Sequence, residues 1–197
     1  NICSQTFQNF ELINVDSGST DGTCEVIKKF NKNIFIKIKP QDYIPGKVLN
    51  DAIAKSKGEI IVFNNSDCIP QNNNWLENLI KPLNTTNKIA TFGCQTPRAN
   101  AQPLVQKDYI RAFGNGNISS QWPNFFSLAT SAIKTEYIKK YPFSNTLQYS
   151  EDIDWAYRMR QKGFEIEYIK NAIVEHSHNY TLKELWKRFY NEGHAEK

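Results

Sequence analysis

Long hydrophobic runs are missing from this chain of 197 residues. The longest uninterrupted apolar run covers residues 60–63, whereas a helix needs about 20 apolar residues to cross a bilayer. No segment with a charged start and an apolar centre, of the kind that directs secretion, opens the sequence. We therefore expect a cytoplasmic protein that spans no membrane.

Closely spaced cysteine pairs are missing as well. The four cysteines stand at positions 3, 24, 68 and 94, without a Cys-x-x-Cys spacing, and the chain has only three histidines. Structural zinc sites are built from closely spaced cysteines and histidines, so we do not expect one. We interpret the cysteines as reduced thiols, which agrees with a cytoplasmic location.

Runs of like charge are absent too. The formal net charge is only +4, and the lysines are scattered along the chain, which argues against a nucleic-acid-binding protein. This mild positive charge fits a protein that handles anionic ligands or lies near an anionic membrane surface. With 40% hydrophobic and 13% aromatic residues, the composition predicts a single globular domain over residues 1–197.

What the sequence does contain is an alternation of strand-like and helix-like segments. This alternation predicts the α/β class, with a mainly parallel sheet flanked by helices. We expect strands at residues 10–15, 33–39, 59–63, 89–94, 165–169 and 172–174, and helices at residues 24–30, 45–57, 75–83 and from 150 onward. Gly58 is the expected C-cap of the second helix. Residues 95–124 hold three prolines and two glycines, which predicts a long loop.

The first polar cluster follows a predicted strand, in FELINVDSGSTDGT at residues 10–23. Gly18 allows the chain to turn sharply, so Asp16 should lie at the carboxyl end of the strand, where ligands bind in open α/β sheets. Backbone N–H groups of such a loop can hold an anion. The alternative is a plain strand, turn and helix cap, with Ser19, Thr20 or Asp21 as the capping residue.

A second polar cluster, NNSDCIP at residues 64–70, also follows a predicted strand. Asn65 and Asp67 are separated by one residue, so their side chains can point toward one place beyond the strand end. Amide and carboxylate oxygens are hard ligands that suit Mg²⁺ or Mn²⁺. The structural alternative is an Asx turn closed by Pro70.

A third cluster, SEDIDWAYRMRQKG, covers residues 150–163. Ser150 is a good helix N-cap, and three carboxylates in the first turn fit the helix dipole. Three acids in five residues also repel one another, and a carboxylate at a helix start can serve as a general base. We expect residues 153, 156 and 157 to be buried, which leaves Glu151 and Asp152 free to act.

A fourth cluster, EHSHNY at residues 175–180, holds two histidines. Strand alternation places His176 and His178 on the same side, so either could complete a metal site, and an imidazole ligand favours Mn²⁺ over Mg²⁺. The next segment predicts a helix with a capping box, Thr181 and Glu184. Its apolar face, with Trp186 and flanking lysines, either packs on the domain or contacts the inner membrane.

These four clusters, in this order, resemble the signature of nucleotide-sugar glycosyltransferases of family 2, which have the fold called GT-A. VDSGSTDGT is similar to the nucleotide-binding loop of that family, FNNSDCIP to its metal-binding DxD position, SEDIDWAYRMRQKGFEI to its acidic acceptor-side motif and VEHSHNYTLKELWKRFYNEG to its closing histidine segment. FGCQTPRANAQPL and EHSHNY resemble the bacterial branch that contains rhamnosyltransferases of surface polysaccharide synthesis.

The resemblance implies a role for each matching residue. Asp152 is the expected catalytic base, with Glu151 beside it on the acceptor side. A divalent ion, Mn²⁺ or Mg²⁺, is expected on Asp67, Asn65 and His176. The donor-binding residues implied by position are Asp16, Ser17, Gly18, Ser19, Asp21, Lys47, Asn50 and Ser66.

The chemistry implied by the resemblance is a single displacement with inversion. Asp152 removes a proton from an acceptor hydroxyl, which attacks the anomeric carbon opposite the leaving nucleoside diphosphate. The metal, assisted by Lys47, offsets the negative charge on the leaving group. The implied donor is a UDP- or dTDP-sugar, the implied acceptor is a glycan or a lipid-linked acceptor, and the implied place is the cytoplasm or the inner face of the membrane.

The chain also departs from the family pattern. Asn65 stands where the family usually has the first aspartate of DxD, and Leu49 stands where it often has an arginine. Residues 1–5 resemble the end of the helix after the first strand of the family, so we expect the sheet to lack that strand. Two alternatives stay open: a non-catalytic glycosyltransferase-like binding module and a sugar nucleotidyltransferase. The acidic early loop counts against the second, which needs a basic, glycine-rich loop.

Overall fold

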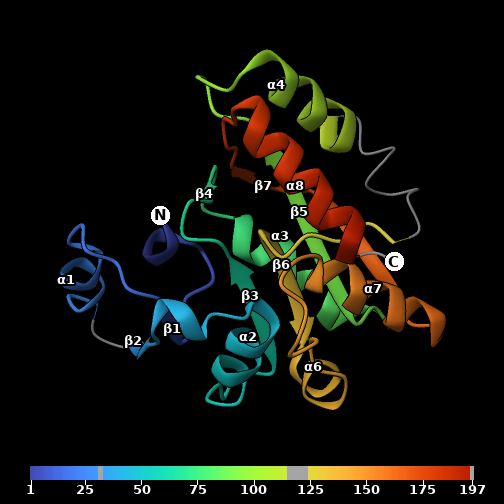
Figure 1. Ribbon diagram of the computed structural model, residues 1–197. Helices are drawn as coiled ribbons and strands as arrows, with labels where there is room; N and C mark the ends of the chain where they lie inside the picture. The colour runs from blue at the N-terminus through green and yellow to red at the C-terminus, as the bar shows by residue number, and fades with distance from the viewer. Residues whose placement is uncertain (31–32, 115–123, 196–197) are drawn as a thin grey trace.

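The computed structural model describes residues 1–30, 33–114 and 124–195, which form two sheets with helices around them (Figure 1). The smaller sheet pairs β1 (Leu12–Asp16) in parallel with β2 (Asn33–Lys37). The larger sheet has the order β3-β6-β5-β7-β4. Its strands are β3 (Ile60–Asn64), β4 (Ile69–Pro70), β5 (Ala90–Thr96), β6 (Thr130–Lys134) and β7 (Ile166–Glu175).

The larger sheet is mixed. β5 and β7 run parallel, whereas β6 is antiparallel to both of its neighbours and β4 is antiparallel to β7. The α/β architecture expected from the sequence is therefore present, and β4 and β6 make the pairing more mixed than the alternation of segments suggests. The strands predicted at 165–169 and 172–174 are one strand, because residues 170–172 form a bulge between the pairs Gly93–Ile169 and Cys94–Ile173.

The larger sheet separates two hydrophobic clusters, each covered by a helix. α3 (Trp75–Thr85) packs on one face, and α7 (Glu151–Gln161) and α6 (Thr135–Lys140) cover the other. Side chains alternate between the faces as strand geometry requires: Ala132 joins the α3 side and its neighbour Ile133 the α7 side. The second and fourth polar clusters lie at one rim of this larger sheet.

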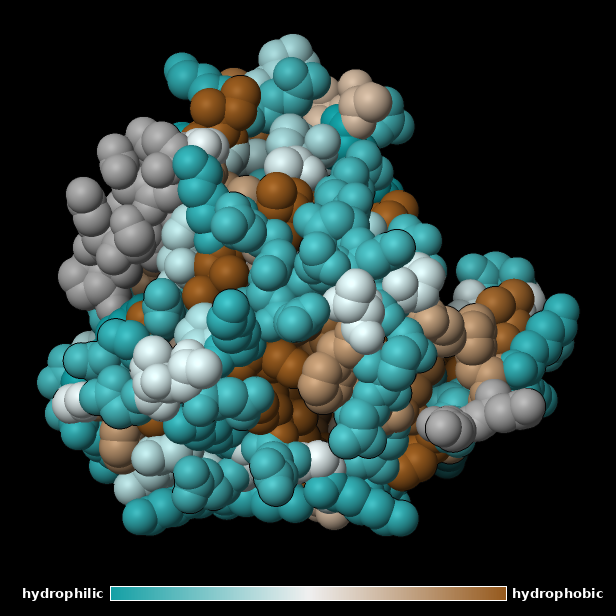
Figure 2. Space-filling view, turned by 180° about the vertical axis from the view of Figure 1, so that it is seen from behind, coloured by the Kyte–Doolittle hydropathy of each residue, from teal (hydrophilic) through white to brown (hydrophobic). Residues whose placement is uncertain are grey.

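The smaller sheet and α1 (Thr23–Ile27) stand to one side of this main body in the front and rear views (Figures 1 and 2). β1 and β3 are each the edge of their own sheet. A cavity of about 500 Å³, lined among others by Val15, Ile36 and Val48, opens between the smaller sheet and α2 (Pro45–Ile53). The prediction that the family's first strand is missing concerns the region between the edge strands β1 and β3, and it stays a prediction.

The remaining elements include several that differ from the predicted ones. α2 ends at Ile53 rather than near Gly58, whose backbone N–H donates instead to the Glu11 carboxylate. The predicted loop contains α4 (Pro103–Tyr109) and the π-helical turn η3 (Ile110–Gly114), and its residues 115–123 lie outside the described part. Two 3-10 turns, η1 (Ile2–Ser4) and η2 (Pro40–Asp42), and α8 (Leu182–Ala195) complete the chain.

The buried face of α7 also differs from the prediction. Trp155, Ala156 and Met159 are buried, whereas Tyr157 is 48% exposed. The large rings decide this orientation, because Trp155 packs against Phe126 at a centroid distance of 5.6 Å. None of the described helices combines the length and the hydropathy that crossing a membrane requires.

Candidate metal and acidic site

The second and fourth polar clusters meet at one rim of the larger sheet. The antiparallel pairing of β4 with β7 joins Ile69 to Glu175, so the turn before β4 lies against the chain that leaves β7. Asp67 Oδ2 lies 2.9 Å from His178 Nε2 and 3.5 Å from His176 Nε2. Both imidazoles therefore lie against one carboxylate, as their spacing in the sequence predicts.

His176 is held by hydrogen bonds to residues that lie outside its own sequence motif. Its Nδ1 lies 2.8 Å from Gln95 Oε1 and 3.1 Å from the Tyr109 hydroxyl. The amide of Gln95 is oriented by a second bond, from Nε2 to Ser127 Oγ at 2.9 Å, so its oxygen faces His176. Burial lowers the pKa of His176, which favours the neutral ring, and the Gln95 oxygen beside Nδ1 favours the tautomer with its proton on Nδ1.

This tautomer leaves a lone pair on His176 Nε2. The atom is buried and has no hydrogen-bond partner among the described residues, although a carboxylate oxygen of Asp67 lies only 3.5 Å away. A lone pair that faces a carboxylate is unfavourable unless a cation lies between them. The pair therefore fits a divalent cation, with Asp67 and His176 as ligands and Gln95 as the partner that orients the ring.

The remaining residues of this turn have mixed surroundings. Asn65 and Ser66 are exposed, and Asn65 takes part in the turn through its backbone, since its carbonyl accepts from Cys68 N–H at 2.9 Å. Arg98 donates to the Asp67 carbonyl at 2.8 Å. Cys68 is buried, and burial with the nearby Asp67 carboxylate raises the pKa of its thiol to about 12.

Residues 127–129 connect the histidine cluster to the acidic helix. Ser127 holds Gln95, the backbone N–H of Leu128 donates to Asp152 Oδ2 at 3.3 Å, and the Ala129 carbonyl accepts from Asn65 N–H at 3.2 Å. Ser127 thus reaches His176 through Gln95, whereas Leu128 contacts Asp152 directly and Ala129 contacts the turn that carries Asp67. The candidate acid and the candidate metal ligands are therefore brought to the same rim.

The start of α7 is held in an unusual backbone conformation. Ser150 has φ 59°, and it is the only non-glycine residue in the described part with positive φ. The predicted N-cap position of Ser150 is confirmed, but its side chain makes no capping hydrogen bond. Left-handed conformations of this kind cost free energy and occur often at functional sites.

The two acids after Ser150 have different environments. Asp152 is not free, because Oδ2 accepts from Leu128 N–H and Oδ1 from its neighbour Ile153 at 2.9 Å. Glu151 is half-buried, and burial, with Asp152 as the second cause, raises its pKa to about 7. A group that titrates near neutral pH is suited to accept or donate a proton.

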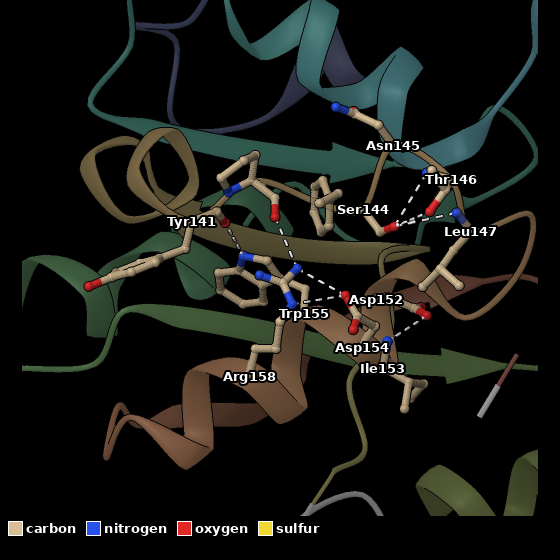
Figure 3. Close-up of polar contacts among 12 residues, drawn as sticks. Tyr141, Ser144, Asn145, Thr146, Leu147, Asp152, Ile153, Asp154, Trp155 and Arg158 are labelled. Atoms are coloured by element: carbon tan, nitrogen blue, oxygen red, sulfur yellow. Dashed lines mark hydrogen bonds and ion pairs between the residues drawn. The ribbon is translucent and has the colours of Figure 1, made fainter. Parts of the chain in front are cut away.

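The body of α7 is anchored to the segment before it, as Figure 3 shows. The Trp155 indole N–H donates to the Tyr141 carbonyl at 2.7 Å. Arg158 pairs with Asp154 at 2.9 Å and also donates to the Pro142 carbonyl. Asp154 therefore has a structural partner, which separates it from the other two acids of the first turn.

The loop after β1 is satisfied within itself. The buried Asp16 carboxylate accepts from the N–H groups of Gly18 at 3.1 Å and Ser19 at 3.2 Å and from the Cys24 thiol. The Ser19 side chain and these bonds lower the pKa of Asp16. Asp21 accepts from the N–H of Thr23 at 3.1 Å. The loop is a self-contained turn with Ser17, Gly18 and Ser19 exposed, but the N-cap of α1 is Gly22 rather than one of the three predicted capping residues.

Within the described residues, the hydrogen bonds of the Asp16 carboxylate stay in its own loop and the first turn of α1 and do not reach Asp67, His176 or Asp152. Lys47 is exposed and pairs with Asp51 at 2.9 Å. The Asn50 side chain is a structural bridge, since it donates to the Phe143 carbonyl and accepts from the Phe143 N–H. The donor-binding roles of these residues remain predictions.

The mixed α/β fold is that of the GT-A class of glycosyltransferases, and solved structures share it. The mannosyltransferase PcManGT from Pyrobaculum calidifontis, in complex with GDP-Man and Mn²⁺, superposes with a TM-score of 0.71 at 19% identity over 95% of this chain and 54% of that chain. Glucosyl-3-phosphoglycerate synthase from Mycobacterium tuberculosis, in complex with Mn²⁺, uridine-diphosphate and phosphoglyceric acid, has a TM-score of 0.61 at 22% identity over 89% of this chain and 62% of that chain.

The sequence places the chain within this class. Residues 1–142 match the profile of Glycosyl transferase family 2, and the chain belongs to this family. It is 31% identical over 208 residues to the O-antigen chain rhamnosyltransferase WbaN of Salmonella anatum, covering 96% of this chain and 63% of that protein. It is 27% identical over 205 residues to the O-antigen chain rhamnosyltransferase RfbN of Salmonella typhimurium, covering 98% of this chain and 65% of that protein. The chain thus spans slightly less than two thirds of these relatives.

Proposed function

We propose that this chain is the catalytic domain of an inverting glycosyltransferase of cell-surface polysaccharide synthesis. The donor is a UDP- or dTDP-sugar, and the acceptor is a hydroxyl of a glycan or of a lipid-linked acceptor. Membership of family 2 and the similarity to two O-antigen rhamnosyltransferases support this proposal. The single observation that carries it is that residues 127–129 are linked to Asp152 directly, to Asp67 through Asn65 and to His176 through Gln95.

Asp152 is the proposed catalytic base. The Leu128 N–H fixes one of its oxygens and so orients the carboxylate toward an acceptor hydroxyl. As Asp152 takes the hydroxyl proton, the acceptor oxygen forms a bond to the anomeric carbon, and the bond from that carbon to the diphosphate breaks with its electron pair on the phosphate oxygen. Attack and departure on opposite sides invert the anomeric centre. Glu151 lies beside the base and contacts the acceptor.

The proposed metal ligands are Asp67 and His176, with Asn65 at the position of the first DxD aspartate. A divalent ion, Mn²⁺ or Mg²⁺, offsets charge on the diphosphate when bound. Asn65 contributes no charge, so the residues of this chain present one carboxylate to the ion rather than two. The donor itself is proposed to contact Asp16, Ser17, Gly18, Ser19, Asp21, Lys47, Asn50 and Ser66.

Calorimetry tests the proposal on the purified full-length protein. UDP and dTDP are titrated with and without Mn²⁺, and the nucleotide that binds then defines the sugar donors for a turnover assay. Asp67→Asn is the matched variant, since it keeps the shape of the side chain and removes its charge. We expect metal-dependent nucleotide binding in the wild type and at least about tenfold weaker binding in the variant. The absence of nucleotide binding under every condition favours the non-catalytic binding module.

A second proposal concerns peripheral contact with the inner membrane through α8. Its outer face carries large exposed side chains between lysines, which is typical of interfacial helices. The exposed fractions are 82% for Leu182, 68% for Trp186, 60% for Phe189 and 60% for Tyr190. We expect Trp186→Asp to reduce sedimentation with anionic liposomes. Val26→Asp, at a 54% exposed position on α1, is the control, and equal sedimentation of both variants contradicts the proposal.

A further inference from the structure

We propose that Cys68 is a direct metal ligand and that Asp67, Cys68, His176 and His178 form a thiol-containing site that prefers Zn²⁺ and Co²⁺ to Mg²⁺. The cluster shares Asp67 and His176 with the proposed glycosyltransferase site, so this inference rests in part on the proposed function. Its new content is the sulfur ligand, the second imidazole and the resulting choice of metal.

The geometry supports a sulfur ligand. The Cys68 sulfur, a carboxylate oxygen of Asp67 and a ring nitrogen of His176 all lie within 4.8 Å of one another. Ligand atoms around a tetrahedral ion are roughly 3–4 Å apart, given metal–ligand bonds of about 2.0–2.3 Å. Small side-chain movements therefore suffice to close these three atoms on one ion.

Two of the three ligands are already held in place. Cys68 is 5% exposed and His176 is 8% exposed. The Cys68 backbone N–H closes the turn with the Asn65 carbonyl at 2.9 Å, and Gln95 fixes the ring of His176 at 2.8 Å. The buried Nε2 of His176 has no hydrogen-bond partner in the part of the chain that the structure describes. An unsatisfied buried nitrogen beside a carboxylate and a thiol is an independent indication of a cation.

His178 supplies the fourth ligand only after its ring moves, because it lies outside the three-residue group whose ligand atoms are within 4.8 Å of one another. Its Nε2 lies 2.9 Å from the Asp67 oxygen that also faces His176, and its ring is perpendicular to that of His176 at a centroid distance of 5.0 Å. The His178 side chain is 47% exposed, so this side of the cluster stays accessible. One exposed ligand allows a donor oxygen to replace it, which a closed structural site does not allow.

The donor set decides the choice of metal. Mg²⁺ prefers oxygen ligands in an octahedral arrangement, whereas a thiolate and two imidazoles suit Zn²⁺ and Co²⁺. The competing assignment for Cys68 is a plain core thiol, because it also belongs to the hydrophobic cluster of Trp75 and Leu76. The two assignments differ in whether the sulfur bonds to an added metal.

Cobalt spectroscopy distinguishes them. Co²⁺ is titrated into the metal-stripped full-length protein under reducing conditions, and the near-ultraviolet band of thiolate-to-cobalt charge transfer is recorded. We expect this band in the wild type and its displacement by excess Zn²⁺. Cys68→Ser and Cys68→Ala should lose the band, with Co²⁺ affinity reduced about 10–100-fold. Cys94→Ser, which changes a buried free cysteine outside the cluster, should keep it.

Each outcome has a definite meaning. The inference is overturned if the wild type lacks the band, or if both Cys68 variants show it as strongly as the wild type does. Circular dichroism identifies which of the two variants keeps the fold. Mn²⁺-dependent nucleotide binding is measured on the same samples. If it persists without the band, the thiol ligand fails and the proposed function stands. If the band is present but no nucleotide binds, the thiol site stands and the proposed function fails.

Discussion

The loops after β1 and β3 look alike in the sequence but differ in what satisfies their aspartates. Asp16 accepts its hydrogen bonds from Gly18, Ser19 and Cys24, all within eight residues. Asp67 contacts His176 and His178, more than 100 residues further along the chain. The first loop folds around its own carboxylate, whereas the second needs a distant segment and leaves a buried nitrogen unsatisfied. Local composition alone does not separate a self-contained turn from a ligand site.

The largest expected effect concerns Asp152, the proposed catalytic base. Asp152→Asn should reduce kcat by about 10²–10⁴-fold, the usual contribution of a general base, and leave nucleotide binding intact because the side chain keeps its shape. Turnover assays and calorimetry measure the two quantities. Asp154→Asn is the control, since Asp154 pairs with Arg158, and it should stay close to wild-type turnover. An active Asp152→Asn protein assigns the base to another residue.

The close packing of β5 against the bulge of β7 can be tested at Gly93. A Cβ at this position would lie 2.3 Å from the Ala172 carbonyl oxygen in the bulge of β7. Gly93→Ala should therefore destabilise the fold by about 1–3 kcal/mol, which lowers Tm by several degrees. At Gly58 the nearest atom to an added Cβ is 3.4 Å away, so Gly58→Ala should melt near the wild type. Equal melting of both variants would contradict the close contact.

The comparison of the two loops predicts opposite responses to alanine. Asp16→Ala should lower Tm by a few degrees, because three donors lose their acceptor, whereas Asp67→Ala should leave the Tm of the metal-free protein unchanged. The lowered pKa of Asp16 means that its contribution is present at neutral pH and is lost as the pH falls through the carboxyl range. The Tm difference from wild type should therefore shrink below about pH 4. If Asp67→Ala lowers Tm and Asp16→Ala does not, the proposed difference between the two loops is wrong.

The smallest effect is expected at Glu151. Its pKa is raised to about 7, so the folded protein binds this proton more tightly than the unfolded chain does. The associated stability is present at acidic pH and is lost as the pH rises from about 4.5 through 7. Glu151→Gln removes this loss, and its Tm should exceed that of the wild type at pH 8 by roughly 2–4 °C. Glu25→Gln, at an exposed position, is the control and should show no gain.

Features that depend on neighbouring residues were predictable from the sequence. The capping box is confirmed, since Thr181 N–H donates to Glu184 at 2.8 Å and Glu184 N–H to Thr181 at 3.3 Å. The α/β alternation is confirmed as well. The predicted loop is wrong at Pro103, which starts α4 rather than breaking a helix. Proline fits the first helical turn because that turn does not use its N–H.

Features that depend on distant residues were not predictable. Gln95 and Tyr109 hold His176 from 81 and 67 residues away, and no sequence motif contains these three together. The predicted buried face of α7 is right for Ala156 but wrong for Tyr157, because Trp155 and Met159 pack into a cluster built from four strands and two other helices. The left-handed Ser150 was not expected either, because serine is a common N-cap in extended conformation.

The bulge in β7 has a consequence for which side of the strand carries the ligands. Three residues, 170–172, are inserted opposite the step from Gly93 to Cys94, and an odd insertion reverses the parity of a strand with period two. Ile166 and Tyr168 accordingly pack on the α7 side, whereas Ala172 and Val174 pack on the α3 side. His176 inherits this reversed parity. A deletion inside the bulge that kept the pairs from Cys94–Ile173 to Thr96–Glu175 would leave the imidazole facing Asp67, whereas a one-residue slip of those pairs would turn it away.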